Sequence, residues 1–123
     1  MSKKRVLIVE DDIWQGDLYL FLLKHDYTAL RVTSAEAAME AIDSFQPDSI
    51  LLDVLLDGAN GITLLHELQS HDDTARIPVI LCTSLEHMHK NSQILAHYGV
   101  KQVLDKATIT PQKIRAAVNG VVI

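Results

Sequence analysis

The sequence has only one cysteine and no long apolar run, and each scarcity excludes a class of protein. Cys82 is the single cysteine among 123 residues, so no internal disulfide can form. This usage favours a reducing compartment, and we expect the cytoplasm. The apolar runs are a few residues long, which excludes a transmembrane helix. The first residues, 1–5, also lack the apolar length of a signal peptide.

Basic residues are scarce as well. Eleven Lys and Arg stand against sixteen Asp and Glu, which gives a formal net charge of −5. Nucleic-acid-binding domains are usually basic, so this balance argues against direct binding of nucleic acid, and it suits a protein that holds a divalent cation. There is no glycine-rich phosphate loop, so a nucleotide is not the expected donor of a phosphoryl group. The length and the 48% hydrophobic content predict one globular domain, residues 1–123.

Short apolar runs alternate five times with longer amphipathic segments. The apolar runs predict strands near 5–9, 28–32, 50–52, 77–83 and 100–104. The amphipathic segments predict helices near 13–24, 34–45, 61–68, 94–98 and 111–121, and 71–74 is expected to be a polar loop. Because strands and helices alternate and crossovers are right-handed, we expect a doubly wound α/β domain with helices on both faces of a parallel sheet.

Several helices carry local signals. The first has apolar residues at helical spacing: Trp14, Leu18, Phe21 and Leu22. Thr33 and Glu36 form a capping box that predicts the start of the second helix. Thr110 is the predicted cap of the last helix, with Pro111 as its first residue.

Chemically active side chains follow four of the five predicted strands, at the point where each strand ends. They are Glu10 and Asp11, Asp53, Thr83 and Ser84, and Lys106. Because the carboxyl ends of parallel strands meet at one edge of a sheet, we expect these groups to converge. Three close carboxylates repel one another unless a cation joins them, and their oxygens suit Mg²⁺. A carboxylate nucleophile, Mg²⁺, a lysine and a hydroxyl together predict a phosphoryl-transfer site.

With these motifs the chain resembles the receiver domain of two-component response regulators. The resemblance covers the whole chain through four matched segments: 6–12 (VLIVEDD), the Asp53 strand with Gly61 eight residues later, 78–84 (PVILCTS) and 103–106 (VLDK). It implies a flavodoxin-like (βα)5 fold with five parallel strands in the order 2-1-3-4-5. It also implies a signalling switch that catalyses only its own phosphorylation and dephosphorylation, and is otherwise not an enzyme.

The resemblance assigns roles to individual residues. Asp53 would accept a phosphoryl group from the phosphohistidine of a sensor histidine kinase or phosphotransfer protein, and would lose it slowly by hydrolysis. Lys106 would pair with the phosphoryl group and Thr83 would move to hydrogen-bond it. The implied ligands of Mg²⁺ are Glu10, Asp11, Asp53 and the backbone carbonyl of Leu55. Contacts with an output domain, a downstream protein or a second copy would use the fourth helix, fifth strand and fifth helix, within 94–118.

Three positions depart from the family pattern. Asp57 stands where the family usually has a proline, Val103 stands where it often has an aromatic switch residue, and Ala107 replaces a cis-proline after the lysine. A cis Lys106–Ala107 bond would cost about 3 kcal/mol, so a trans bond with a reshaped loop and a strained cis bond both stay open. These departures raise one alternative, a pseudo-receiver that binds partners without being phosphorylated. The complete set of site residues, namely Glu10, Asp11, Asp53, Thr83 and Lys106, argues against it.

Other interpretations compete for the same residues. Haloacid-dehalogenase-like phosphatases also use a strand-end Asp, but they need a second Asp two residues later, where this chain has Leu55. The acidic run 10–12 could instead add charge to the first turn of a helix, and Asp12 is its predicted cap. The six histidines do not match a zinc-binding spacing, and Cys82 is expected in the core. Both a stand-alone regulator and a piece of a longer chain fit the sequence.

Overall fold

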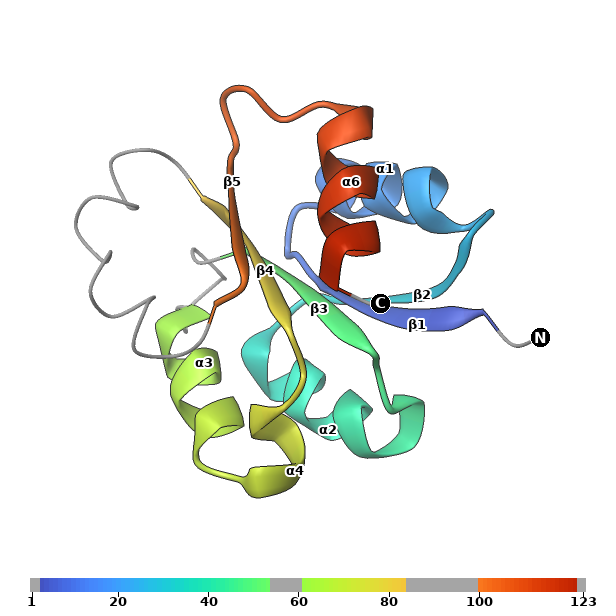
Figure 1. The fold of residues 1–123 in the computed structure, drawn as a ribbon. Coiled ribbons are helices and arrows are strands. Elements are labelled where there is room, and N and C mark those ends of the chain that lie inside the picture. Colours follow the sequence, from blue (N-terminus) through green and yellow to red (C-terminus); the bar gives the residue numbers. More distant parts are fainter. Residues whose placement is uncertain (1–2, 54–60, 84–99, 122–123) are drawn as a thin grey trace.

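The computed structural model describes residues 3–53, 61–83 and 100–121, and these residues form a parallel sheet covered on both faces by helices (Figure 1). The sheet has five strands in the order β2-β1-β3-β4-β5, which confirms the predicted topology. The strands are β1 (Lys4–Val9), β2 (Tyr27–Val32), β3 (Ser49–Asp53), β4 (Val79–Thr83) and β5 (Gln102–Asp105).

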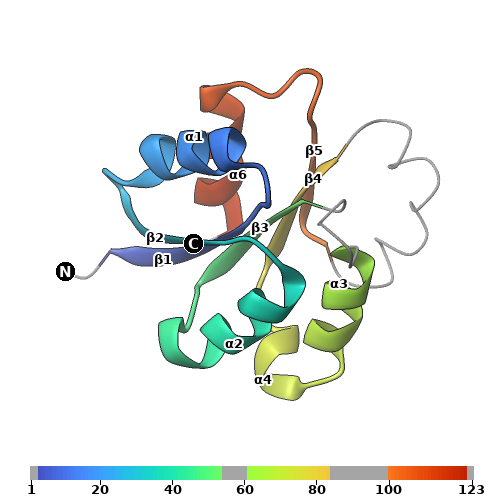
Figure 2. The ribbon, with the colours of Figure 1, turned by 180° about the vertical axis from the view of Figure 1, so that it is seen from behind.

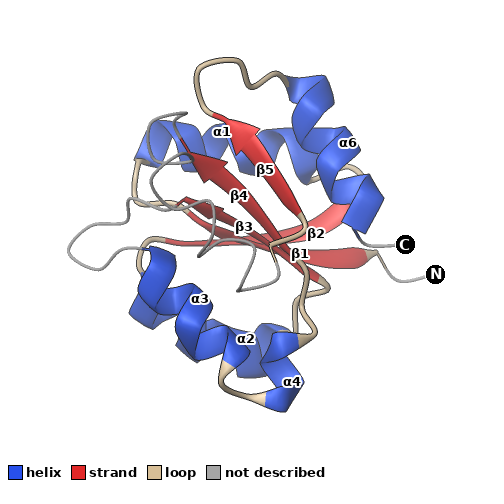
Figure 3. Cartoon of the chain, turned by 60° about the vertical axis from the view of Figure 1, so that its left-hand side comes forward, coloured by secondary structure: helices blue, strands red, loops and turns tan. Residues whose placement is uncertain are grey.

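The described helices form two outer layers. They are α1 (Ile13–Leu23), α2 (Ala35–Phe45), α3 (Gly61–Gln69), α4 (Asp72–Ala75) and α6 (Pro111–Val121). One face of the sheet is covered by α1 and α6, and the other by α2, α3 and α4 (Figures 2 and 3). The predicted loop at 71–74 is wrong, because α4 makes one helical turn there. The helix predicted at 94–98 lies outside the described residues.

The central strands are buried because helices cover both of their faces. Every residue of β3 and β4 is buried, and the side chains of successive residues enter two separate cores. Ile50 and Leu52 pack toward α2 and α3, while Leu51 packs toward α1 and α6. This alternation fixes the register, in which Val9 lies beside Leu52. The strand ends are therefore held at defined positions along one edge of the sheet.

Helix α1 does not bury the face that its sequence suggests. Trp14 is 85% exposed and Phe21 60%, and Ile13 and Leu18 are also exposed. The residues that it buries are Gly16, Tyr19, Leu22 and Leu23. The spacing of Trp14, Leu18 and Phe21 correctly predicts a helix here, but it does not identify the buried face, because apolar residues occur all around this helix.

The helix caps follow the sequence with one exception. Asp12 and Thr110 cap α1 and α6, and each side chain accepts a hydrogen bond from the N–H three residues later, at 2.9 and 3.2 Å. Ser34, rather than the predicted Thr33, caps α2 in the same way at 3.0 Å. The two residues cap almost equally well, so the sequence does not fix which one is used; β2 runs to Val32, and the helix begins one residue later than predicted.

None of the helices in the described ranges combines the length and the apolar character that crossing a membrane requires.

Candidate functional site

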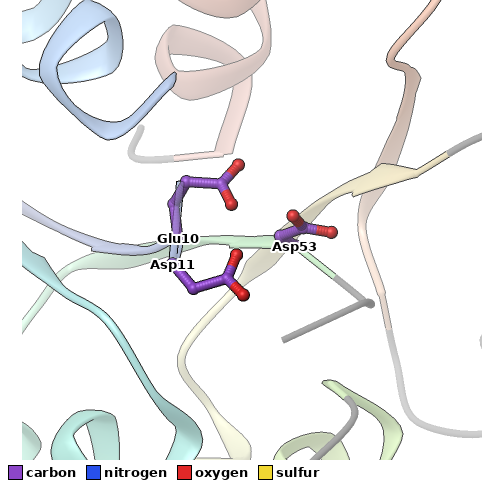
Figure 4. Close-up of side chains that lie close together, drawn as sticks. All are labelled: Glu10, Asp11 and Asp53. Carbon is purple, nitrogen blue, oxygen red and sulfur yellow. The ribbon is translucent and has the colours of Figure 1, made fainter. Parts of the chain in front are cut away.

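Two neighbouring strands place three carboxylates together at one edge of the sheet. Asp53 is the last residue of β3, and Glu10 and Asp11 follow the end of β1. The N–H of Glu10 donates to the carbonyl of Val32 at 3.0 Å, which keeps Glu10 in line with the sheet. One ligand oxygen from each of Glu10, Asp11 and Asp53 lies within 4.8 Å of the others (Figure 4). The predicted convergence of these three residues is therefore observed.

Lys106 joins this cluster from β5. Its backbone N–H donates to the carbonyl of Thr83 at 2.9 Å, which fixes the turn after the strand. Its Nζ lies 2.5 Å from Asp53 Oδ2 and 3.9 Å from Glu10 Oε1. The Lys106–Ala107 peptide is trans, so of the two conformations that the sequence left open, the strained cis bond is excluded. Ala107 closes the turn by donating its N–H to Asp105 Oδ1 at 3.0 Å.

Two buried oxygens at the site lack hydrogen-bond partners among the described residues. They are Glu10 Oε1 and Thr83 Oγ1, on side chains that are almost fully buried. Buried polar atoms are nearly always hydrogen-bonded, so these two oxygens are candidates for contacts beyond those among the described residues. Asp11 is half-buried and Lys106 is 37% exposed, and the site opens to solvent on their side.

Burial and charge shift the titration of the site. Burial raises the pKa of Glu10 to about 8, and the hydrogen bond and charge of Asp53 act in the same direction, against the charge of Lys106. Burial alone would lower the pKa of Lys106, but the hydrogen bond and charge of Asp53, and the charge of Glu10, outweigh it and raise that pKa. The site therefore holds an excess of acidic groups, one of which keeps its proton at neutral pH.

This cluster fits Mg²⁺ by its donor set. Its ligands are carboxylate oxygens, which hard divalent cations prefer, and Glu10 Oε1 accepts no hydrogen bond from the described residues. A divalent cation would also favour the ionised form of Glu10, against the burial and the Asp53 interactions that raise its pKa. Leu55, whose carbonyl is the fourth predicted ligand, lies outside the described residues, as do Asp57 and Ser84.

The remaining candidates lie outside the carboxylate cluster. Cys82 is buried in β4 within the α1 and α6 core, and burial raises the pKa of its thiol to about 12. Val103 packs against the opposite core. His25, His66 and His71 belong to no metal-compatible group in the described ranges.

One residue beside the site is not predicted by the sequence. Arg31 on β2 donates from Nε to the backbone carbonyl of Glu10, at 3.3 Å. A single arginine in an edge strand with weak alternation carries no motif, and only the fold brings it to the turn after β1.

Comparison with known proteins gives the same assignment over nearly the whole chain. The family model for the response regulator receiver domain matches residues 6–119. The regulatory protein VanR of Enterococcus faecium is 34% identical over 84 residues, which are 68% of this chain and 35% of that protein. The chain thus spans about a third of the length of this curated relative.

Solved structures agree on the fold. A putative response regulator from Chloroflexus aurantiacus superposes with a TM-score of 0.88 at 26% identity, over 98% of both chains. The receiver domain of the sensor histidine kinase PA1611 from Pseudomonas aeruginosa, described with a magnesium ion in its active site cleft, has a TM-score of 0.85 at 18% identity, over 98% of both chains. From the family match, the strand order and the fold, the chain belongs to the response regulator receiver domain family.

Proposed function

We propose that this chain is a single receiver domain in which Asp53 accepts a phosphoryl group from a phosphohistidine. The proposal rests mainly on one observation: carboxylate oxygens of Glu10, Asp11 and Asp53 lie within 4.8 Å of one another, and Lys106 Nζ lies 2.5 Å from Asp53 Oδ2. A carboxylate nucleophile, an acidic cation site and an ammonium group are what phosphoryl transfer to a side chain requires.

Each residue has a distinct task in this reaction. Asp53 attacks phosphorus with a carboxylate oxygen, so that a P–O bond forms while the P–N bond to the donor histidine breaks. Lys106 moves its ammonium from the carboxylate to the incoming phosphoryl oxygens and offsets their charge. Thr83, whose buried hydroxyl has no partner among the described residues, donates a hydrogen bond to one of those oxygens.

Glu10, Asp11 and Asp53 hold Mg²⁺ in this proposal, with Leu55 as a backbone ligand. The bound ion supplies positive charge that neutralises the phosphoryl oxygens during transfer. The acyl phosphate is then hydrolysed slowly at the same residues, and the phosphorylated state lasts for a limited time. The domain acts as a timed switch that controls contacts with partners.

Incubation with Mg²⁺ and acetyl phosphate, followed by intact-mass measurement, tests the proposal. One added phosphoryl group is the expected result. An unchanged mass would instead favour the pseudo-receiver, to which the departures at Asp57, Val103 and Ala107 point. Steady turnover of a generic phosphate ester would favour the phosphatase.

The raised pKa of Glu10 gives a prediction for the metal-free protein. Folded Glu10 keeps its proton up to about pH 8, whereas the unfolded chain releases it near 4.5. The contribution of this group to the free energy of unfolding is therefore fully present below pH 4.5, and it is lost as the pH rises to 8. We expect wild type to lose stability relative to Glu10→Gln across that window, by at most about 1.4 kcal/mol per pH unit.

Urea unfolding of both proteins in EDTA from pH 5 to 9 measures this difference. A difference that does not change with pH would show that Glu10 is not protonated in the folded site. Adding Mg²⁺ at pH 8 should stabilise wild type more than Glu10→Gln, because the ion takes the place of the proton.

The exposed apolar side chains of α1 support a docking role for this helix. Trp14, Leu18 and Phe21 follow one another at helical spacing on its solvent side, and α1 begins two residues after Asp11. Apolar residues gathered on a surface beside a reaction site are typical of partner contacts. We therefore propose that the phosphodonor protein docks on this face of α1.

Leu18→Glu tests this docking surface. The phosphodonor is a histidine phosphotransfer protein that phosphorylates wild type. We expect Leu18→Glu to slow this phosphotransfer by about tenfold or more, because a charge is placed in an apolar contact. Phosphorylation by acetyl phosphate, which needs no docking, should be unchanged. Leu30→Glu is the matched control, since Leu30 is an exposed leucine on β2 rather than α1. Equal effects on both donors would contradict the docking role.

We propose that the output of the switch uses another part of the domain, within residues 94–118. Within 94–118, β5 and the start of α6 are described, and the fourth helix of the prediction is not. We place contacts with an output domain, a downstream protein or a second copy there, and the domain in the cytoplasm.

A further inference from the structure

The side chain of Arg31 packs against Gly16, the single glycine of α1. The arginine belongs to the edge strand β2, and its guanidinium lies against Gly16 near the start of α1, the helix above this end of the sheet (Figure 2). A Cβ at position 16 would lie 2.9 Å from Arg31 Cδ and Cζ, and closer still to Nε. A glycine inside a helix weakens the helix, so its presence here makes room for the arginine.

This arrangement is a poor stabilising interaction by itself. The Arg31 side chain is 15% exposed, yet Nη2 is buried without a partner among the described residues, and Nη1 is 4.0 Å from the exposed Asp17. A largely buried cation with incomplete hydrogen bonding contributes little to stability. Local features that disfavour folding are concentrated at functional sites, and this one adjoins the acidic cluster.

The contact that Arg31 does make reaches the site directly. Its Nε donates to the carbonyl of Glu10, which belongs to the peptide between Glu10 and Asp11. Fixing this peptide fixes the backbone from which two of the three clustered carboxylates extend. We propose that Arg31, seated on Gly16, is a positioning residue that sets the turn after β1 for Mg²⁺ binding. This inference rests on the proposed function of the same site.

The sign of the effect separates positioning from simple electrostatics. Removing a cation near a cation site would strengthen Mg²⁺ binding if charge alone mattered. Removing a group that orients the ligands weakens Mg²⁺ binding instead. Loss of a contact that holds a metal ligand in place typically lowers the affinity for the metal about tenfold. The two explanations therefore predict opposite changes in affinity.

The test measures the thermal-unfolding midpoint against Mg²⁺ concentration, since a ligand that binds the folded state raises that midpoint according to its affinity. Wild type, Arg31→Met, Gly16→Ala and the double variant are compared. We expect Arg31→Met to need an Mg²⁺ concentration about tenfold higher than wild type for the same rise in the unfolding midpoint. Gly16→Ala should also need more Mg²⁺, because its methyl group displaces the guanidinium, while its midpoint without Mg²⁺ stays the same or rises.

The double variant should need no more Mg²⁺ than Arg31→Met, because both changes break the same contact. Equal or tighter Mg²⁺ binding by Arg31→Met, or losses that add in the double variant, would overturn the positioning role. A wild type whose midpoint does not respond to Mg²⁺ would overturn the proposed function, and this inference with it. A normal wild-type response with unaffected variants would overturn this inference alone.

Discussion

Asp53→Asn is expected to abolish phosphorylation by acetyl phosphate and by a phosphohistidine donor. The amide is nearly the same shape as the carboxylate, so the fold should be kept, but it is not a nucleophile toward phosphorus. Intact-mass measurement after incubation with Mg²⁺ and acetyl phosphate should show the unmodified mass alone.

Asp12→Asn is the matched control for this change. Asp12 lies one residue from the cluster and caps α1, and asparagine caps a helix equally well. We expect this variant to be phosphorylated like wild type. Phosphorylation of Asp53→Asn at the wild-type level would show that another residue is the acceptor.

Lys106→Met is expected to slow phosphorylation by about 100-fold or more. The ammonium lies 2.5 Å from Asp53 Oδ2, where the phosphoryl oxygens would arrive, and removing one such charge-stabilising donor from a reaction site typically costs this much. Methionine keeps the unbranched apolar stem of lysine without the ammonium group, so packing after β5 should be preserved. Rates of phosphorylation at saturating Mg²⁺ measure the effect.

Lys101→Met provides the control for loss of one positive charge. Lys101 is exposed and precedes β5, whereas Lys106 follows it, so the two lysines stand at opposite ends of the strand. We expect its rate to equal that of wild type. If Lys106→Met were also phosphorylated at the wild-type rate, Lys106 would have no role in the reaction.

The sheet could be predicted from the sequence because its central strands are buried on both faces. Runs such as 50–52 are apolar without alternation, and polar residues follow them abruptly, so both the parallel sheet and its edge are visible in the chain. The convergence of Glu10, Asp11, Asp53 and Lys106 then follows from topology, because parallel strands end at the same edge.

The face of α1 could not be predicted, for a physical reason. Trp14, Leu18 and Phe21 have the spacing of a buried stripe, but Tyr19, Leu22 and Leu23 do as well, and the latter set is buried. Periodicity reports that a helix has apolar faces, not which partner each face meets. The exposed set becomes informative only because the structure shows it on the solvent side of a helix that begins two residues after Asp11.

Contacts between single residues that are far apart in the sequence could not be predicted either. Nothing near Gly16 or Arg31 in the sequence relates the two, and only the packing of α1 on β2 brings them together. The Lys106–Ala107 bond was undecided for the same reason. Its conformation depends on how the turn is closed by Asp105.

Mapping the phosphorylated residue is the most direct test of the account. Wild-type protein is phosphorylated with acetyl phosphate and Mg²⁺, the acyl phosphate is reduced with borohydride, and peptides are analysed by mass spectrometry. The account predicts conversion at Asp53 alone, and none when EDTA replaces Mg²⁺. Conversion at any other carboxylate, or modification that does not depend on Mg²⁺, would contradict it.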